Sequence, residues 1–250
     1  MTNTLIKPRV TSRAEDTRRK IYEAAMQLFR EKGFEETTMR DIAAKAGVAL
    51  GGTYYYYSSK DAIVLAFYRE MQESSTALVG AALADKKKLK DRIRAVLDQR
   101  LKLLAPNRKF CAALFRHAPD GTDPLSPFSD ETRLIRDAAI EQMQAALEGG
   151  DAKIPSDLKP RLPYLLWLYQ MALIMFWLYD RSPAQERTTK LMEKSLGLLV
   201  NLLRISSLPL MKPLRKAVLE LVETASGPSE RHLPDIAPLE LTDAGRENRA

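Results

Sequence analysis

The sequence predicts an all-α protein with a small N-terminal helical domain and a larger helical body. Apolar residues recur at helical spacing along most of the chain, whereas the alternating pattern of half-buried strands is scarce. A length of 250 residues is enough for one or two domains with a buried core. The single cysteine excludes a disulfide framework, and no signal peptide is evident, so we expect a cytoplasmic location.

The chain begins with a basic arm, residues 1–13, that lacks apolar periodicity. Positive side chains continue into the first predicted helix, and they are Lys7, Arg9, Arg13, Arg18, Arg19 and Lys20. The net charge of +7 suits a polyanionic partner without requiring one. The arm is either a solvated tail or a contact to the minor groove of a nucleic acid. The first helix should begin at residue 11 or 14, run to Lys32 and stop at Gly33.

Residues 37–61, TTMRDIAAKAGVALGGTYYYYSSKD, contain the pattern of a helix-turn-helix. Thr38 is followed three residues later by Asp41, an arrangement close to a capping box that predicts a helix beginning at Met39. Gly47 suits the turn because glycine tolerates a positive φ. In such motifs the second helix enters the major groove of DNA with its N-terminal residues at the base edges. The segment therefore predicts a DNA-binding unit.

The second helix of this unit should begin near Ala49, and it carries four successive tyrosines. A helix turns by ~100° per residue, so four rings cannot share one face. We expect Tyr54 and Tyr56 to point outward, Tyr57 to point inward and Tyr55 to do either. The expected DNA contacts are Thr38, Arg40, Ala49, Leu50, Gly51, Thr53, Tyr54, Tyr55, Tyr56 and Lys60. A tyrosine-rich packed helix without a nucleic-acid role is the alternative, which the basic flanks disfavour.

These residues resemble the tetracycline-repressor (TetR) family of bacterial regulators over roughly residues 14 to 65. The matching positions are Ile21, Ala24, Ala25, Leu28 and Phe29, then Gly33-Phe34, Thr37-Thr38, Ile42-Ala43, Ala46-Gly47-Val48, Tyr54-Tyr55-Tyr56 and Ser59-Lys60-Asp61. The chain departs from the family pattern at Gly52, Thr53 and Tyr57, which affects the expected set of base contacts. The resemblance implies a DNA-binding head whose orientation is controlled by the C-terminal body.

The fourth helix should be capped by Ser58 and Ser59 and continue to about Ala84. Because it leaves the tyrosines and reaches the body, it could convert a change in the body into a rotation of the head. The body should continue with helices at 89–104, 107–117 and 130–147 and a loop at 118–129. His117 lies near Cys111 in sequence, but no spacing matches a metal or catalytic signature. We therefore expect no enzyme, no metal site and no cofactor.

Residues 162–179, LPYLLWLYQMALIMFWLY, contain no formal charge. A membrane span needs ~20 such residues, so insertion is one interpretation. Gln170 near the middle and aromatic rings spread along the segment favour a helix buried all round, with one face against a partner chain. Residues 188–205 add an apolar stripe, whose expected dimer contacts are Leu191, Ser195, Leu196, Leu199 and Leu202. Two such helices and their copies would form a four-helix interface across a twofold axis.

Several large side chains of the body could line a cavity for a small hydrophobic ligand. The expected lining residues are Phe110, Leu114, Phe115, His117, Tyr164, Trp167, Gln170 and Met171. Each of them could instead be an ordinary core residue.

We therefore divide the chain into an arm (1–13), a helix-turn-helix domain (14–60), a helical ligand-binding and dimerisation domain (61–225) and a tail expected to be disordered (226–250). The predicted function is that of a homodimeric transcriptional repressor that binds a palindromic DNA operator. A lipophilic or aromatic inducer would release it from the DNA. The alternative is a nonspecific DNA-binding or interaction protein without an inducer.

Overall fold

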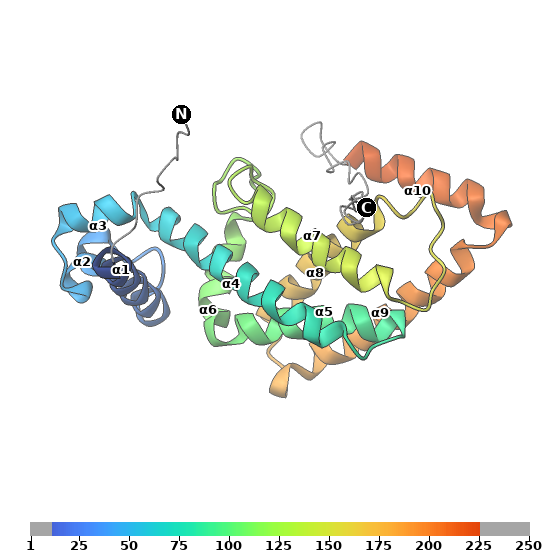
Figure 1. Ribbon diagram of the computed structural model, residues 1–250, viewed down its shortest axis with the longest axis horizontal. Helices are drawn as coiled ribbons and strands as arrows, with labels where there is room; N and C mark the ends of the chain where they lie inside the picture. The colour runs from blue at the N-terminus through green and yellow to red at the C-terminus, as the bar shows by residue number, and fades with distance from the viewer. Residues whose placement is uncertain (1–11, 226–250) are drawn as a thin grey trace, which may run out of the picture. The chain divides into compact units, whose positions relative to one another are not determined.

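The computed structural model describes residues 12–225, and within that range the regular structure is helical without any strand (Figure 1). The helices are α1 (Ser12–Glu31), α2 (Met39–Ala46), α3 (Leu50–Tyr56), α4 (Lys60–Leu83), α5 (Leu89–Leu104), α6 (Arg108–Leu114), α7 (Arg133–Glu148), α8 (Leu162–Tyr179), α9 (Glu186–Ser206) and α10 (Lys212–Ala225). The predicted all-α class is confirmed. Most of the expected basic arm, and the whole of the expected tail at 226–250, lie outside the described residues.

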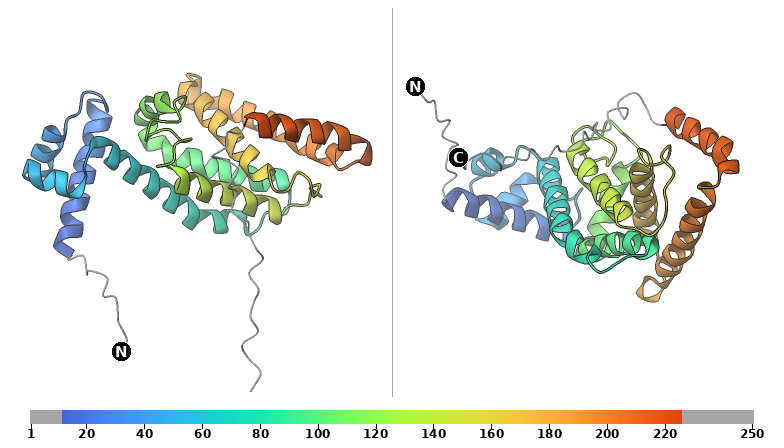
Figure 2. Two further views of the ribbon diagram at one scale, coloured as in Figure 1. Left: turned by 90° about the horizontal axis from the view of Figure 1, so that it is seen from above. Right: turned by 45° about the vertical axis from the view of Figure 1, so that its right-hand side comes forward.

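The chain divides into two compact units, residues 1–207 and residues 208–250. Helices α1 to α9 belong to the first unit and α10 to the second. We call residues 12–59 the head and α4 to α9 the body. Helix α4 begins directly after the head and packs along α5 and α7 of the body (Figures 1 and 2).

Local signals fix both ends of α2. The hydroxyl of Thr38 accepts a hydrogen bond from the Asp41 amide, and the Asp41 carboxylate accepts one from the Thr38 amide. This reciprocal capping box starts the helix at Met39, as the sequence predicts. Gly47 ends the helix with a φ of 66°, in the left-handed region that suits glycine. The turn that follows sets the direction of α3.

The hydroxyl of Ser59 caps α4 by accepting a hydrogen bond from the amide of Ala62. At the other end of α4, the guanidinium of Arg92 on α5 donates to four backbone carbonyls. Two of them, at Leu83 and Lys86, belong to the end of α4 and the turn after it. The other two, at Ala145 and Ala146, belong to α7. One side chain therefore joins three helices of the body at this corner.

Helix α8 packs against α6, α7 and α9. By length and composition it is the one candidate membrane span among the described residues, and half of its 18-residue stretch is buried inside the protein. Gln170 near its middle is buried as well. The burial against three neighbours agrees with the prediction of a core helix with one outward face.

Candidate functional site

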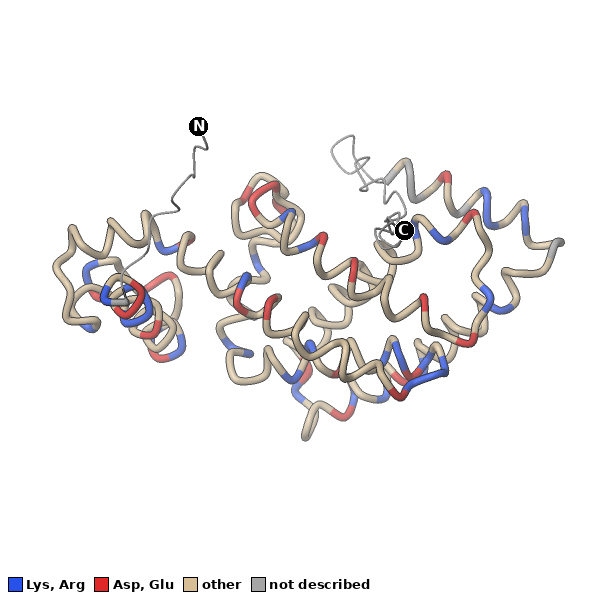
Figure 3. Tube along the Cα trace, viewed as in Figure 1, with Lys and Arg blue, Asp and Glu red and all other residues tan. Residues whose placement is uncertain are grey.

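The exposed part of α3 consists of the start of the helix and two of its tyrosines. Ala49, Leu50 and Gly51 are exposed. Tyr55 is 83% exposed, and Tyr54 is about half exposed. The helix carries no charged residue (Figure 3). This surface offers apolar contacts and phenolic hydroxyl groups, both of which can contact base edges or phosphates.

Thr53, which we expected to face bases, lies in the core. Its side chain is fully buried, and its hydroxyl donates to the carbonyl of Ala49. Thr53 stands one helical turn before Tyr57, which is buried as predicted, so both residues fall on the inward face. Tyr56, expected to point outward, is half-buried and packs against the same core. The outward tyrosines of this helix are therefore Tyr54 and Tyr55.

Lys60, expected to contact a phosphate, is turned toward the head itself. Its ammonium donates to the carbonyls of Phe34, at 2.8 Å, and Glu35, at 3.3 Å. It also lies 4.5 Å from the centroid of the Phe34 ring. These contacts hold the loop between α1 and α2 against the start of α4. In this structure the Lys60 ammonium is thus engaged by carbonyls of the head, and its contact with DNA stays a prediction.

The start of α2 carries an exposed polar cluster beside α3. Thr38 and Arg40 are exposed, as a DNA contact requires. The Asp41 carboxylate accepts hydrogen bonds from the Lys32 ammonium, at 2.8 Å, and from Thr38. The hydrogen bond from Lys32, followed by those from Thr38, lowers the pKa of Asp41 to about 2. The carboxylate therefore stays charged, and the cap stays formed, throughout the physiological pH range.

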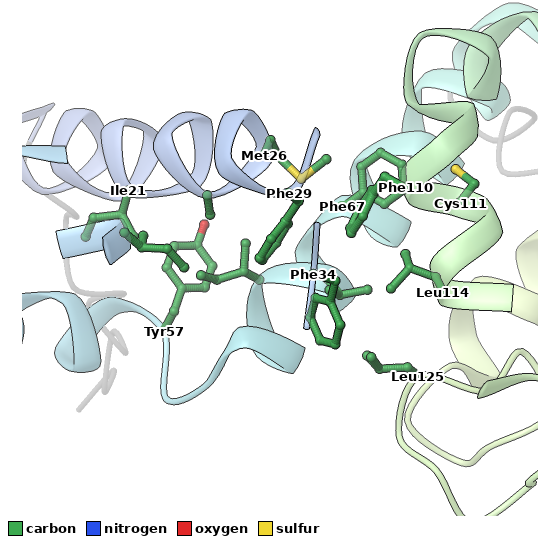
Figure 4. Close-up of a cluster of buried hydrophobic side chains, with 14 of the residues drawn as sticks. Ile21, Met26, Phe29, Phe34, Tyr57, Phe67, Phe110, Cys111, Leu114 and Leu125 are labelled. Atoms are coloured by element: carbon green, nitrogen blue, oxygen red, sulfur yellow. The ribbon is translucent and has the colours of Figure 1, made fainter. Parts of the chain in front are cut away.

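Aromatic rings join the head to the body. Phe29 of α1 stacks on Phe110 of α6, with ring centroids 5.1 Å apart, and Phe67 of α4 meets Phe110 edge-on at 5.4 Å. Figure 4 shows these three rings between α1 and α6. A hydrogen bond of 3.1 Å from Arg30 to the Asn107 side chain lies beside them. The head is thus packed on the body through buried side chains, in addition to its covalent link through α4.

Two of the residues expected to line a cavity belong to this head–body contact instead. Phe110 is buried in the cluster just described. His117 contacts the Phe34 ring edge-on, and its Nδ1 lies 2.6 Å from the Asp123 carboxylate. A third expected residue, Tyr164, stacks on Trp167, which lines the cavity described below, but Tyr164 is not itself a lining residue. The positions of Phe110 and His117 depend on Phe29 and Phe34, which are distant in sequence, so the helical pattern did not show them.

The body contains a cavity with about 140 Å³ of free space, lined by residues of α4, α5, α6, α7 and α8. Its wall includes five of the expected residues, namely Leu114, Phe115, Trp167, Gln170 and Met171. The remaining lining residues are Phe67, Tyr68, Met71, Gln72, Arg100, Leu104, Cys111, Pro127, Thr132, Ile135, Arg136, Ala139, Ile174 and Leu178. The wall is mostly apolar with a few polar groups, as is usual for small-molecule sites.

Arg100 and the contribution of α4 to the cavity were not predicted from the sequence. Arg100 occupies the apolar stripe of α5, after Leu89, Ile93 and Leu97, which are all buried. A charged residue at a position of this kind is a signal that could have been read from the sequence. Four residues of α4, from Phe67 to Gln72, also line the cavity. The helix that carries the head therefore forms part of the cavity wall.

Helices α8 and α9 present an apolar surface. On α9, Leu191, Leu198, Leu202 and Ile205 are exposed at helical spacing, and on α8 Met175 and Tyr179 are exposed. Of the other expected dimer contacts, Ser195 and Leu199 are partly buried, and Ser195 is hydrogen-bonded to the Tyr169 hydroxyl. Leu196 is fully buried within the chain, so it cannot contact a partner. The apolar stripe of α9 is thus broader than one interface requires, and part of it is buried within the chain.

Within residues 12–225, no three His, Cys, Asp or Glu side chains are grouped as metal ligands would be. Cys111 is buried, and burial raises the pKa of its thiol to about 12, which leaves it protonated and unreactive at neutral pH. The notable features of this chain are therefore a helix-turn-helix head, a head–body contact and a cavity in the body. Together they define the class of helix-turn-helix DNA-binding proteins with an additional helical body.

Comparison with known families identifies the chain more closely. The family model "Bacterial regulatory proteins, tetR family" matches residues 21–67, and the model "Tetracyclin repressor-like, C-terminal domain" matches residues 92–222. The second match alone spans more than half of the chain. The protein therefore belongs to the TetR family of DNA-binding transcriptional regulators, which are not enzymes.

Individual relatives agree with this assignment. The HTH-type transcriptional regulator YfiR of Bacillus subtilis is 46% identical over 55 residues, which are 22% of this chain and 27% of that protein. The chain thus spans about a quarter of the length of this curated relative. A TetR-family regulator from Syntrophomonas wolfei superimposes with a TM-score of 0.57 at 20% identity, over 78% of this chain and 98% of that one. FadR of Bacillus subtilis in complex with stearoyl-CoA gives 0.56 at 17%, over 73% and 97%.

Proposed function

We propose that the protein is a homodimeric repressor that binds a palindromic operator and is released by a small apolar ligand in the body cavity. The observation that carries this proposal is the position of α4. Its N-terminal end, at Lys60, is joined to the head by hydrogen bonds to the loop before α2. Its middle, from Phe67 to Gln72, forms one wall of the cavity. A ligand that occupies the cavity therefore touches the helix that carries the head.

The head supports specific DNA binding only when two copies act together. One α3 presents a short exposed surface, of which Leu50, Tyr54 and Tyr55 are the large side chains. Such a surface covers few base pairs, so useful specificity needs two half-sites related by the symmetry of a dimer. The exposed apolar stripe of α9, with Leu198 and Leu202 at its centre, is suited to a symmetric interface.

The apolar character of the inducer is supported by the cavity wall, where Trp167, Phe115 and Met171 are among the lining side chains. A structural neighbour, FadR of Bacillus subtilis, was crystallised with stearoyl-CoA. That complex supports an acyl or similarly lipophilic ligand for a body of this fold. A ligand can release DNA only if it binds more tightly to the head arrangement that does not fit two half-sites.

Selection from a pool of random DNA duplexes, followed by gel shift, tests the DNA part of the proposal. We expect an inverted repeat that binds one dimer. Recovery of no repeat, with equal affinity for every duplex, would instead support a nonspecific DNA-binding protein.

Tryptophan fluorescence during a ligand screen, with and without saturating operator, tests the induction. Because the coupling is reciprocal, operator DNA must weaken the ligand by the same factor by which the ligand weakens the DNA.

A further inference from the structure

Arg100 is a buried cation without a counter-anion. Its residue is 7% exposed, and its Nη2 donates to the side-chain oxygens of Gln72, at 2.6 Å, and Gln142, at 3.2 Å. Its Nε is buried without any hydrogen-bond partner. Within the described part of the chain no carboxylate forms an ion pair with it. Arginine is seldom buried unless it is paired, because removing a charge from water is costly.

The guanidinium belongs to the wall of the cavity. The nineteen lining residues include Arg100 and Arg136 but no Asp or Glu. Gln170, on the wall with them, has a buried side-chain oxygen that also lacks a partner. Burial lowers the pKa of Arg100 to about 10, so the group still carries its charge at neutral pH. The cavity thus combines an apolar wall with an uncompensated positive charge.

We propose that the cavity binds a compact amphiphilic carboxylate, whose carboxylate group pairs with Arg100 and whose apolar part packs against Trp167 and Phe67. This inference rests on the proposed function, because it takes the cavity as the inducer site and names the chemistry of the inducer. The planar guanidinium matches the two oxygens of a carboxylate and would satisfy the unpaired Nε. The amide of Gln170 lies on the same wall and can take part through either of its polar atoms.

The two cations of the wall differ in the hydrogen bonds that they already make. Arg136, the second cation, already donates from Nη1 to the carbonyls of Pro127 and Ser129. Arg100, by contrast, keeps its buried Nε without a partner, so its planar group can still pair with the two oxygens of one carboxylate. The free space of about 140 Å³ also suits a small acid. A coenzyme A thioester has no carboxylate at its acyl end. It is therefore a probe that distinguishes a carboxylate ligand from the broader proposal of an acyl ligand.

The test compares matched probes on the full-length protein. Octanoate, octanamide and octanoyl-CoA are titrated while the fluorescence of tryptophan, which includes Trp167 on the cavity wall, is followed. We expect octanoate to bind at least roughly tenfold more tightly than octanamide, because hydrogen bonds to a charged partner are about twice as strong as neutral ones. Equal affinity of octanoate and octanamide, or binding of octanoyl-CoA alone, would overturn the inference.

Arg100→Met keeps the length of the side chain and removes its charge. We expect it to weaken octanoate to the level of octanamide and to leave octanamide unchanged. Arg100→Lys, which keeps a cation without the planar fork, should recover part of the preference. Arg133→Met removes an exposed arginine from α7 and serves as the matched control, with octanoate binding unchanged. A preference for octanoate that persists in Arg100→Met would overturn the inference.

A separate stability measurement covers the case in which Arg100→Met changes the fold. The thermal midpoint of the ligand-free variant should equal or exceed that of the wild type, because an unpaired buried charge has been removed. Octanoate should raise the midpoint of the wild type and of Arg100→Lys, but not that of Arg100→Met. If Arg100→Met does not fold, the wild-type comparison of octanoate with octanamide and the Arg100→Lys titration decide the question.

Gel shifts with the selected operator distinguish this inference from the proposed function. Preferential octanoate binding without any release of DNA would uphold the carboxylate site and overturn induction through the cavity. Release of DNA by octanamide or octanoyl-CoA at lower concentrations than octanoate would uphold induction and overturn the carboxylate site.

Discussion

The ring of Phe29 stacks on the ring of Phe110, with centroids 5.1 Å apart and planes inclined by 16°. Phe29 belongs to the first helix of the head and Phe110 to α6 of the body, so this contact connects two regions about 80 residues apart in sequence. Leu114, one turn further along α6, lines the cavity. A displacement of α6 by a ligand would therefore be transmitted to α1 as well as to α4.

Phe110→Ala tests this connection. We expect the substitution to lower the free energy of unfolding by about 3–5 kcal/mol, because it leaves a void between three packed rings. Urea denaturation measures the change. Leu134→Ala, at a position on α7 that is 77% exposed, is the control and should change the free energy of unfolding by less than about 0.5 kcal/mol. Equal stability of Phe110→Ala and the wild type would show that head and body do not pack through this ring.

The capping box of α2 predicts a dependence of stability on pH. The Lys32 ammonium, together with Thr38, lowers the pKa of Asp41 to about 2 from its ordinary value near 3.8. The carboxylate therefore contributes stability that is complete above about pH 4 and is lost as the pH falls toward 2. Asp41→Asn should remove this part of the acid transition, which thermal melts at a series of pH values measure. An unchanged pH profile in Asp41→Asn would contradict the assignment.

Salt dependence separates DNA contacts from contacts within the head. Arg40 is exposed on α2 beside α3, so Arg40→Ala should reduce the slope of log affinity against log salt by about 0.9, the value for one lost phosphate contact. Lys60→Ala should destabilise the head instead, because it removes the hydrogen bonds to Phe34 and Glu35, and should leave that slope unchanged. Binding titrations over a salt series distinguish them. A reduced slope in Lys60→Ala would return that residue to the DNA surface.

Leu50 is exposed at the beginning of α3, where a recognition helix meets base edges. Leu50→Ala should therefore change the preference among operator variants while leaving the affinity for unrelated DNA nearly constant. Each altered base contact is worth about 1–3 kcal/mol of discrimination. Competition gel shifts with single-base variants of the selected operator measure this. A uniform loss of affinity for all duplexes would place Leu50 outside the base-reading surface.

The apolar face of α9 offers a matched pair of substitutions. Leu202 is 56% exposed, whereas Leu196 on the same helix is fully buried within the chain. Leu202→Asp should give a folded monomer that no longer binds the operator, because a carboxylate buried in an interface without a partner costs several kcal/mol. Leu196→Asp should unfold the chain instead. Light scattering and circular dichroism together report these outcomes. A Leu202→Asp dimer of normal mass would place the interface elsewhere.

The features that the sequence predicted correctly depend on neighbours along the chain. The start of α2 follows from Thr38 and Asp41, three residues apart, and its end follows from the tolerance of Gly47 for positive φ. The all-α class follows from periodicity in the same way. The resemblance to TetR regulators also rests on a local pattern, and the family comparison confirmed it.

The features that the sequence did not predict depend on distant partners. The loop containing Phe34 meets Lys60 only after α1 to α3 have packed, so a basic residue that looked available for a phosphate is engaged by carbonyls. The inward position of Thr53 depends on the exact phase of a helix only seven residues long. The cavity depends on five helices together, so neither the place of Arg100 on its wall nor the lack of an acidic residue there follows from the pattern of α5 alone.

The hydrogen bonds from Arg92 to four carbonyls fix the C-terminal end of α4 to α5 and α7. The opposite end of α4, at Lys60, is hydrogen-bonded to the head. With a rise of 1.5 Å per residue, α4 is ~36 Å long, so a rotation of ~3° about its C-terminal end moves its N-terminal end by ~2 Å. In a symmetric dimer the N-terminal ends of both copies of α4 would move together, and the distance between the two heads would change by up to twice that amount. Under the proposed function, a small shift of α4 at the cavity would therefore be enough to misalign both heads with the grooves of a rigid duplex.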